Sequence, residues 1–172
     1  LKFDIGIFTN LSQDHLDYHK SLKNYLEAKL YLFNSLIKKR GNIITDETIP
    51  EFRNLKKIAK NKKLNLQTIV NRKNKFEVIS HNFLGESQLV RIKHNNIIKN
   101  IKINLVGKIQ LKNLLMSIIA AKHSNINLNK ILKVVEKLKP VEGRFEKIGV
   151  IKNRSKVILD YAHTPDALKT CL

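Results

Sequence analysis

The chain has 172 residues and a mass of 19.9 kDa, enough for one ordinary domain or for one domain with part of another. Its hydrophobic fraction of 42% excludes wholesale disorder. The single cysteine, Cys171, excludes a disulfide framework, and no apolar run approaches the roughly 18 residues that span a bilayer. We therefore expect a folded cytoplasmic protein without a membrane partner. The absence of an initiating Met and of a signal peptide predicts a piece of something longer.

The charge is strongly basic, because 33 Lys and Arg residues stand against 14 Asp and Glu residues and give a net charge of +19. Such an excess is typical of nucleic-acid-binding proteins. However, only six of the 33 are Arg, and the abundant Lys, Asn and Ile residues all have AT-rich codons, so a low-GC genome accounts for the excess. The cations are scattered, and aromatic residues make up only 6%. We expect no nucleic-acid partner, and a basic nucleic-acid-binding α/β module is the alternative.

Strands and helices are predicted to alternate in the first part of the chain. The predicted elements are a buried strand over 3–9, a polar loop over 10–20, a helix over 22–39 with Ser21 as its N-cap, a strand over 42–45, a helix opened by Asp46 with Pro50 in its first turn, and a strand over 67–70. This β-α-β-α-β order predicts an α/β fold with a mainly parallel sheet flanked by helices.

The remainder begins with strands alone. Strand-like runs over 76–80, 88–93 and 97–105 predict an antiparallel β excursion from the parallel sheet. Helices are predicted over 111–122 and from a cap at 127–129 to about 138, and a hairpin over 147–151 and 156–161 follows. Thr164 and Pro165 then suit the N-cap and first position of a final helix.

Three segments carry candidate chemistry. The first, over residues 10–19, contains Asp14 and His15 just beyond a predicted strand, where ligands gather in open α/β sheets. Carboxylate and imidazole groups bind divalent metals such as Mg²⁺, although a polar loop with hydrogen-bonding histidines gives the same pattern.

The second candidate is Lys29, which falls on the apolar stripe of the helix predicted over 22–39, four residues after Tyr25 and four before Phe33. A buried ammonium must be neutralised, paired or modified, and a neutral amine can take up CO₂ as a carbamate. A lysine that snorkels from the edge of the stripe is the alternative.

The third candidate combines Arg144, in Gly-Arg-Phe-Glu, with Asp160 and His163, in Asp-Tyr-Ala-His-Thr-Pro-Asp. An Arg in a turn can clamp phosphate oxygens, and an Asp at a strand end can accept ribose hydroxyls. A surface Arg and a capping Asp remain the alternative. The sequence has no G-x-x-x-x-G-K-[ST] phosphate loop.

Taken in order, four motifs resemble those of the Mur ligase family: Thr-Asn-Leu-Ser-Gln-Asp-His-Leu-Asp-Tyr-His over 9–19, Tyr-Leu-Glu-Ala-Lys over 25–29, Gly-Arg-Phe-Glu over 143–146, and Asp-Tyr-Ala-His-Thr-Pro-Asp-Ala-Leu over 160–168. The last is similar to the branch that adds the third amino acid of the peptidoglycan stem peptide. The resemblance implies an ATP-dependent amide ligase that joins a diamino acid, meso-diaminopimelate, to UDP-N-acetylmuramoyl-L-alanyl-D-glutamate through an acyl phosphate.

The resemblance also implies roles for single residues. In the family, the residue matching His15 binds Mg²⁺, and the lysine matching Lys29 is carbamylated and serves a second Mg²⁺ and the acyl phosphate. The residue matching Asn113 contacts adenine, and those matching Arg144, Asp160 and His163 belong to the ATP site. One departure is Gln110, which stands where the family has an Asn.

The resemblance further predicts a domain division. Residues 1–142 are expected to be part of the central ATP-binding domain, with the phosphate loop and the UDP-sugar domain upstream. Residues 143–172 are expected to begin the C-terminal domain. The 172 residues alone are therefore expected not to catalyse the reaction.

Overall fold

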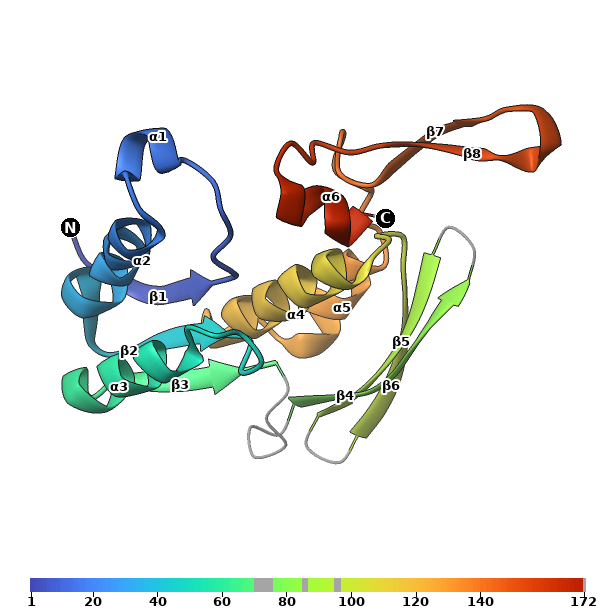
Figure 1. Ribbon diagram of the computed structural model, residues 1–172. Coiled ribbons are helices and arrows are strands. Elements are labelled where there is room, and N and C mark those ends of the chain that lie inside the picture. Colours follow the sequence, from blue (N-terminus) through green and yellow to red (C-terminus); the bar gives the residue numbers. More distant parts are fainter. Residues whose placement is uncertain (70–75, 85–86, 95–96, 172) are drawn as a thin grey trace.

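Two sheets and a hairpin make up the β structure of the computed structural model, which describes residues 1–69, 76–84, 87–94 and 97–171 (Figure 1). The parallel sheet has the order β1 (Phe3–Phe8), β2 (Ile37–Thr45), β3 (Asn65–Thr68). The antiparallel sheet has the order β4 (Phe76–Leu84), β5 (Ser87–His94), β6 (Ile97–Ile103). The predicted α/β class with an antiparallel excursion is confirmed, although the antiparallel strands form a sheet of their own. Residue 70, the end of one predicted strand, lies outside the described residues.

Helices cover both faces of the parallel sheet. Consecutive residues of a strand point to opposite faces, so Ile43 and Ile44 of β2 contact different helices. On one side, Ile43 packs with buried residues of α2 (Leu22–Tyr31) and α3 (Phe52–Lys62). On the other side, Ile44 packs with α4 (Lys108–His123) and α5 (Leu128–Val135). The core that contains Ile44 continues into β5 and β6, so α4 and α5 lie between the two sheets (Figure 1).

The helix predicted over 22–39 is shorter than expected. Ser21 caps α2 as predicted, since its Oγ accepts a hydrogen bond from the Asn24 N–H at 3.1 Å. A π-helical turn, η1 (Leu32–Leu36), ends the helical segment, and β2 begins at Ile37, opposite Phe3 of β1. The polar run 38–40 suits the last turn of a helix, but in the structure it lies within β2, between Ile37, which pairs with Phe3, and Asn42, which pairs with Ile5.

Close packing explains the glycine in the middle of β1. A Cβ atom at Gly6 would lie 2.8 Å from Cε1 of Phe33 and 2.9 Å from Cδ1 of Ile37. Both side chains are buried, and the Phe33 ring also lies 6.0 Å from the Phe8 ring. Phe33 and Ile37, which follow α2, therefore pack directly against the backbone of β1.

Two further predictions in the first part of the chain are wrong in detail. The polar loop over 10–20 contains a one-turn helix, α1 (Leu16–His19). The second helix begins at Phe52 and not at Asp46, since the Asp46 carboxylate is occupied with a turn before it. Asp46 Oδ1 accepts hydrogen bonds from the N–H and the hydroxyl of Thr48, at 2.9 and 2.8 Å.

A buried glutamine supports the entry to α4. Gln88 of β5 is fully buried, and its Nε2 donates a 2.6 Å hydrogen bond to the carbonyl of Leu105. Gly107, the N-cap residue of α4, has a φ of 96°, a conformation that glycine adopts without strain. The chain can therefore turn from β6 into α4.

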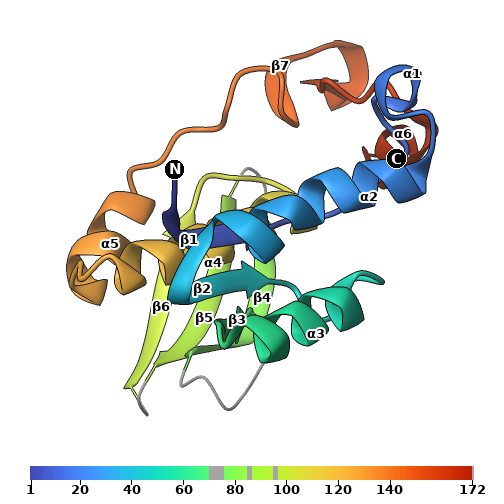
Figure 2. The ribbon, with the colours of Figure 1, turned by 90° about the vertical axis from the view of Figure 1, so that its left-hand side faces the viewer.

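The last segment contains the predicted hairpin and helix. Its elements are β7 (Glu146–Val150), the 3₁₀ turn η3 (Lys152–Arg154), β8 (Lys156–Leu159) and α6 (Pro165–Cys171). Thr164 Oγ1 accepts from the Ala167 N–H at 3.3 Å, which confirms the predicted cap. Figure 2 shows β7 reached by a long connection from α5. Among the described helices, none has the length and apolar character to cross a membrane.

Candidate active site

The candidate site lies where the parallel strands end. Phe8, Thr45 and Thr68 are the last residues of β1, β2 and β3. The Thr45 hydroxyl donates a 2.9 Å hydrogen bond to the Phe8 carbonyl, so the ends of β1 and β2 are fixed to one another. The loops that follow these two strands leave from this edge, the place where open α/β sheets bind ligands.

Lys29 reaches this edge from α2. Its Nζ donates a 2.8 Å hydrogen bond to the Asn10 carbonyl, just beyond β1. The same amine lies 4.8 Å from the ring centre of Tyr25 and 5.6 Å from that of Phe8. Lys29 is half-buried, and its amine points into the site instead of snorkelling away from it.

Asp14 joins the first loop to the last segment of the chain. Its Oδ2 lies 3.5 Å from His15 Nε2, and its Oδ1 lies 3.7 Å from His163 Nε2. His15 has a left-handed φ of 54°, and its N–H donates to Asp14 Oδ1 at 2.8 Å. The structure thus brings together two motifs separated by about 150 residues in the sequence.

The Tyr25 ring contacts two histidines, His15 and His19, and also lies beside the Lys29 amine. The His19 ring stacks on the Tyr25 ring with their centres 4.6 Å apart, and the His15 ring meets it edge-on at 6.0 Å. His15 and Lys29 therefore share one aromatic neighbour and lie on the same side of the sheet. Tyr25 was not among the site residues predicted from the sequence, although its spacing of four residues from Lys29 indicated a contact.

Asp160 organises the turn that carries Arg144. Its Oδ2 accepts a 2.6 Å hydrogen bond from the Phe145 N–H, and the Gly143 carbonyl accepts one from the Tyr161 N–H at 2.8 Å. The Arg144 guanidinium carbon lies 4.9 Å from the ring centre of Tyr161. The two motifs at 143–146 and 160–168 therefore form one unit.

The remaining oxygen of Asp160 contacts the end of α6. Asp160 Oδ1 accepts a 3.4 Å hydrogen bond from Cys171 Sγ. Burial, and then the hydrogen bond and negative charge of Asp160, raise the pKa of the Cys171 thiol. Cys171 is therefore a neutral donor that helps to hold Asp160.

An ion pair between a buried carboxylate and an exposed lysine connects the end of β2 to α4. Asp46 Oδ2 lies 2.5 Å from Lys112 Nζ, with the Asp46 side chain 1% exposed and that of Lys112 46% exposed. Desolvation raises the pKa of Asp46, but the hydrogen bonds from Lys112 and Thr48, with the Lys112 charge, outweigh it and leave the pKa lowered. Asn113, the next residue, is exposed on the first half of α4. Our reading of the sequence missed this pair, which no local pattern indicates.

Comparison with known proteins decides the family. The Mur ligase middle domain matches residues 1–121, more than half of the chain. The chain belongs to the Mur ligase family. It is 34% identical to the UDP-N-acetylmuramoyl-L-alanyl-D-glutamate--2,6-diaminopimelate ligase of Rickettsia typhi over 171 residues, which are 99% of this chain and 34% of that relative.

Solved structures of Mur ligases have the same fold. MurF from Acinetobacter baumannii matches with a TM-score of 0.81 at 16% identity, over 97% of this chain and 36% of that one. A UDP-N-acetylmuramoyl-L-alanyl-D-glutamate--2,6-diaminopimelate ligase structure matches with a TM-score of 0.73 at 26% identity, over 97% of this chain and 35% of that one. The chain spans about a third of the length of the relatives that it matches.

The side chains beyond the end of β1 offer the kinds of donor atom that bind a divalent cation. Asp14 offers carboxylate oxygen, and the two histidines on either side of it offer imidazole nitrogen. Among the described residues, however, no three His, Cys, Asp or Glu side chains are grouped so as to hold a metal. Other ligands, such as phosphate oxygens or water, are needed to complete such a site.

Proposed function

We propose that these residues are part of an ATP-dependent ligase that joins meso-diaminopimelate to UDP-N-acetylmuramoyl-L-alanyl-D-glutamate in the cytoplasm. The observation that carries this proposal is the meeting of Asp14, His15 and His163 at the carboxyl end of β1, where Lys29 also points. Membership of the Mur ligase family and the name of the R. typhi relative support the reaction and the amino acid.

Lys29 is proposed to act as a carbamate. The lone pair of the neutral amine forms an N–C bond to the carbon of CO₂, one C=O π bond opens and leaves its electron pair on oxygen, and one proton of the amine leaves. The carbamate nitrogen keeps one N–H, so the hydrogen bond to the Asn10 carbonyl can persist while the two new oxygens extend into the site. An anion is unfavourable against the faces of Phe8 and Tyr25, which explains why it needs a cation nearby.

His15 and Asp14 are proposed to hold Mg²⁺, which would neutralise phosphate charge when ATP activates the substrate carboxylate. The nucleotide is proposed to bind Asn113, Arg144, Asp160 and His163. Asp160 can still accept a ribose hydroxyl, because its two oxygens have about four lone-pair sites and two are used. Arg144 is exposed, and its guanidinium lies over the Tyr161 ring, where its N–H groups can donate to a phosphate.

The test is release of ADP by this chain joined to the sequence that flanks it in its own gene. We expect ADP only when UDP-N-acetylmuramoyl-L-alanyl-D-glutamate and meso-diaminopimelate are both present, with at least tenfold less when L-lysine replaces the latter. His15→Ala should abolish turnover, whereas His123→Ala, an exposed histidine at the far end of α4, should leave it unchanged. ADP release that ignores the muramoyl substrate would refute the proposal.

A further inference from the structure

The segment 45–48, at the end of β2, contacts several neighbouring elements within a few residues. The Thr45 hydroxyl donates a 2.9 Å hydrogen bond to the Phe8 carbonyl at the end of β1. Glu47 Oε2 accepts a 3.1 Å hydrogen bond from the hydroxyl of Thr68, the last residue of β3. The carboxyl ends of the three parallel strands are therefore fixed to this one segment.

Asp46, in the same segment, joins these strand ends to α4. Lys112 Nζ lies 2.5 Å from Asp46 Oδ2 and donates a second, longer hydrogen bond to Thr48 Oγ1 at 3.4 Å. The Asp46 side chain is 1% exposed, and a carboxylate buried to that extent needs its cation, because removing one partner leaves an uncompensated charge. The fold therefore favours keeping Lys112 at the end of β2.

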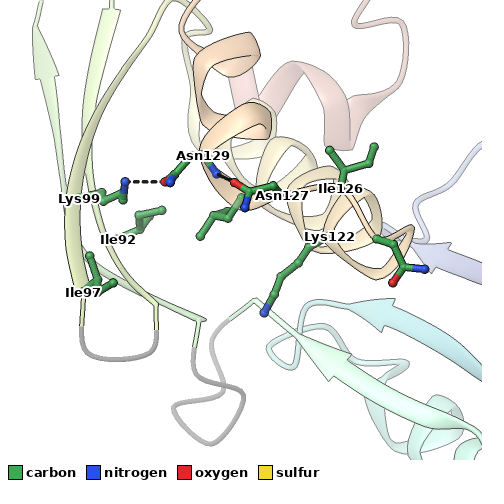
Figure 3. Close-up of a pocket in the computed structure, with 9 residues that line it drawn as sticks. Ile92, Ile97, Lys99, Lys122, Ile126, Asn127 and Asn129 are labelled. Carbon is green, nitrogen blue, oxygen red and sulfur yellow. Dashed lines mark hydrogen bonds between the residues drawn. The ribbon is translucent and has the colours of Figure 1, made fainter.

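The two ends of α4 are held differently. At its last turn, a cavity of about 550 Å³ lies between the antiparallel sheet and the corner where α4 leads into α5, and Lys122 is among the residues that line it (Figure 3). In the first half of α4, Lys112 stands four residues after the first residue of the helix. Its ion pair is directional, unlike the apolar contacts of the buried residues of α4, so it fixes the position of this half of the helix.

Asn113 follows Lys112 and is exposed. Successive residues of an α-helix are turned by roughly 100° about its axis, so the two side chains leave α4 in different directions. Lys112 reaches the end of β2, while Asn113 stays accessible to a ligand. Because both residues belong to one helical turn, a shift of Lys112 relative to β2 moves Asn113 as well.

We propose that Asp46 and Lys112 are positioning residues that set where Asn113 meets the adenine ring of ATP. This inference rests on the function proposed above, in which Asn113 contacts the base. Phe8, which is bonded to the same segment, has its ring 5.6 Å from the Lys29 amine. The segment 45–48 therefore holds the proposed base contact and the proposed carbamate at a fixed separation.

The affinity for ATP tests this proposal, measured by isothermal titration calorimetry with Mg²⁺ on this chain joined to the flanking sequence of its own gene. Lys112→Met should weaken ATP binding at least fivefold, and Lys112→Arg, which keeps the cation, should bind within twofold of the parent. Lys130→Met, the matched control, removes the same charge from an exposed position on α5 and should leave affinity unchanged. If Lys112→Met does not fold, Asp46→Asn with Lys112→Met removes both charges and should show the same loss.

Asn113→Ala shows whether the pair acts through Asn113. In that background Lys112→Met should cause no further loss, because the residue that it positions is gone. An equal loss in both backgrounds would overturn the proposal, and so would unchanged affinity in Lys112→Met or a parent that does not bind ATP.

Release of ADP is scored separately from binding. A parent that binds ATP, and in which the loss caused by Lys112→Met requires Asn113, supports the positioning role even if no ADP is released with the muramoyl substrate. That result would refute the ligase assignment alone.

Discussion

Lys29 is the residue whose chemistry is most open to test, because its amine is already fixed at the Asn10 carbonyl. In the ligase proposed above, we expect Lys29→Ala to lower kcat at least a hundredfold. Lys29→Arg should be as inactive, since it keeps a cation where an anion is required. The measurement is ADP release with and without added acetate or formate, which should partly rescue the alanine variant only. Near-normal turnover by Lys29→Arg would eliminate the carbamate role.

Asp46 gives a pH-dependent prediction at the same scale. Its pKa is lowered on folding, so its charge stabilises the fold above the ordinary value of 3.8, and this contribution fades as pH falls through the lowered pKa. Asp46→Asn should reduce the free energy of unfolding by about 1–3 kcal/mol at pH 7. Urea unfolding at a series of pH values should show the difference between variant and parent shrinking below pH 3.8. A difference that stays constant down to pH 2 would contradict this account.

Local motifs marked candidate residues in the sequence, whereas residues paired across the fold could not be predicted. His15 and Lys29 stand out because their neighbours in the chain form recognisable patterns. The ion pair of Asp46 and Lys112 joins residues 66 positions apart, and its existence depends on how α4 packs on the parallel sheet. From its immediate neighbours alone, Asp46 was therefore predicted to open a helix.

At the scale of elements, the N-cap of α2 is the feature to test. Ser21 Oγ accepts the Asn24 N–H, so Ser21→Ala should lower the free energy of unfolding by about 1 kcal/mol. Ser21→Asp should retain stability, because Asp caps as well as Ser and its charge suits the start of a helix. Urea denaturation of both variants provides the comparison. Equal losses for Ala and Asp would indicate that the Ser21 side chain does not cap α2.

Apart from the one-turn helix α1, element types were predictable, whereas element boundaries were not. Hydrophobic periodicity correctly predicted a helix after Ser21, but the predicted helix ran to residue 39, beyond the buried Ile37. Ile37 is buried as a strand residue opposite Phe3, and only the presence of β1 makes that pairing available. Strand pairing is a tertiary effect, so no local pattern could place the end of the helix at Leu36.

At the scale of the molecule, the residues proposed to bind the nucleotide would form only one side of its site. We expect the isolated 172 residues to bind ATP no more tightly than about 1 mM, because backbone N–H groups of a phosphate loop normally supply much of the recognition of a triphosphate. Isothermal titration calorimetry with ATP and Mg²⁺ tests this, with adenosine as the control for the base and ribose alone. Micromolar binding would show that the triphosphate is recognised by residues within this chain.

The net charge of +19 carries the last prediction. If it reflects composition alone, affinity for a DNA duplex should be weak and should fall steeply between about 50 and 200 mM salt, without dependence on which lysines are present. Removing two charges from α3, by Lys56→Gln with Lys60→Gln, should then weaken binding as much as removing two from α5, by Lys130→Gln with Lys133→Gln. All four side chains are exposed, so both variants should fold.

Fluorescence anisotropy at the two salt concentrations makes the comparison. A loss confined to one of these helices, with submicromolar affinity at the higher salt, would instead identify a true nucleic-acid-binding surface.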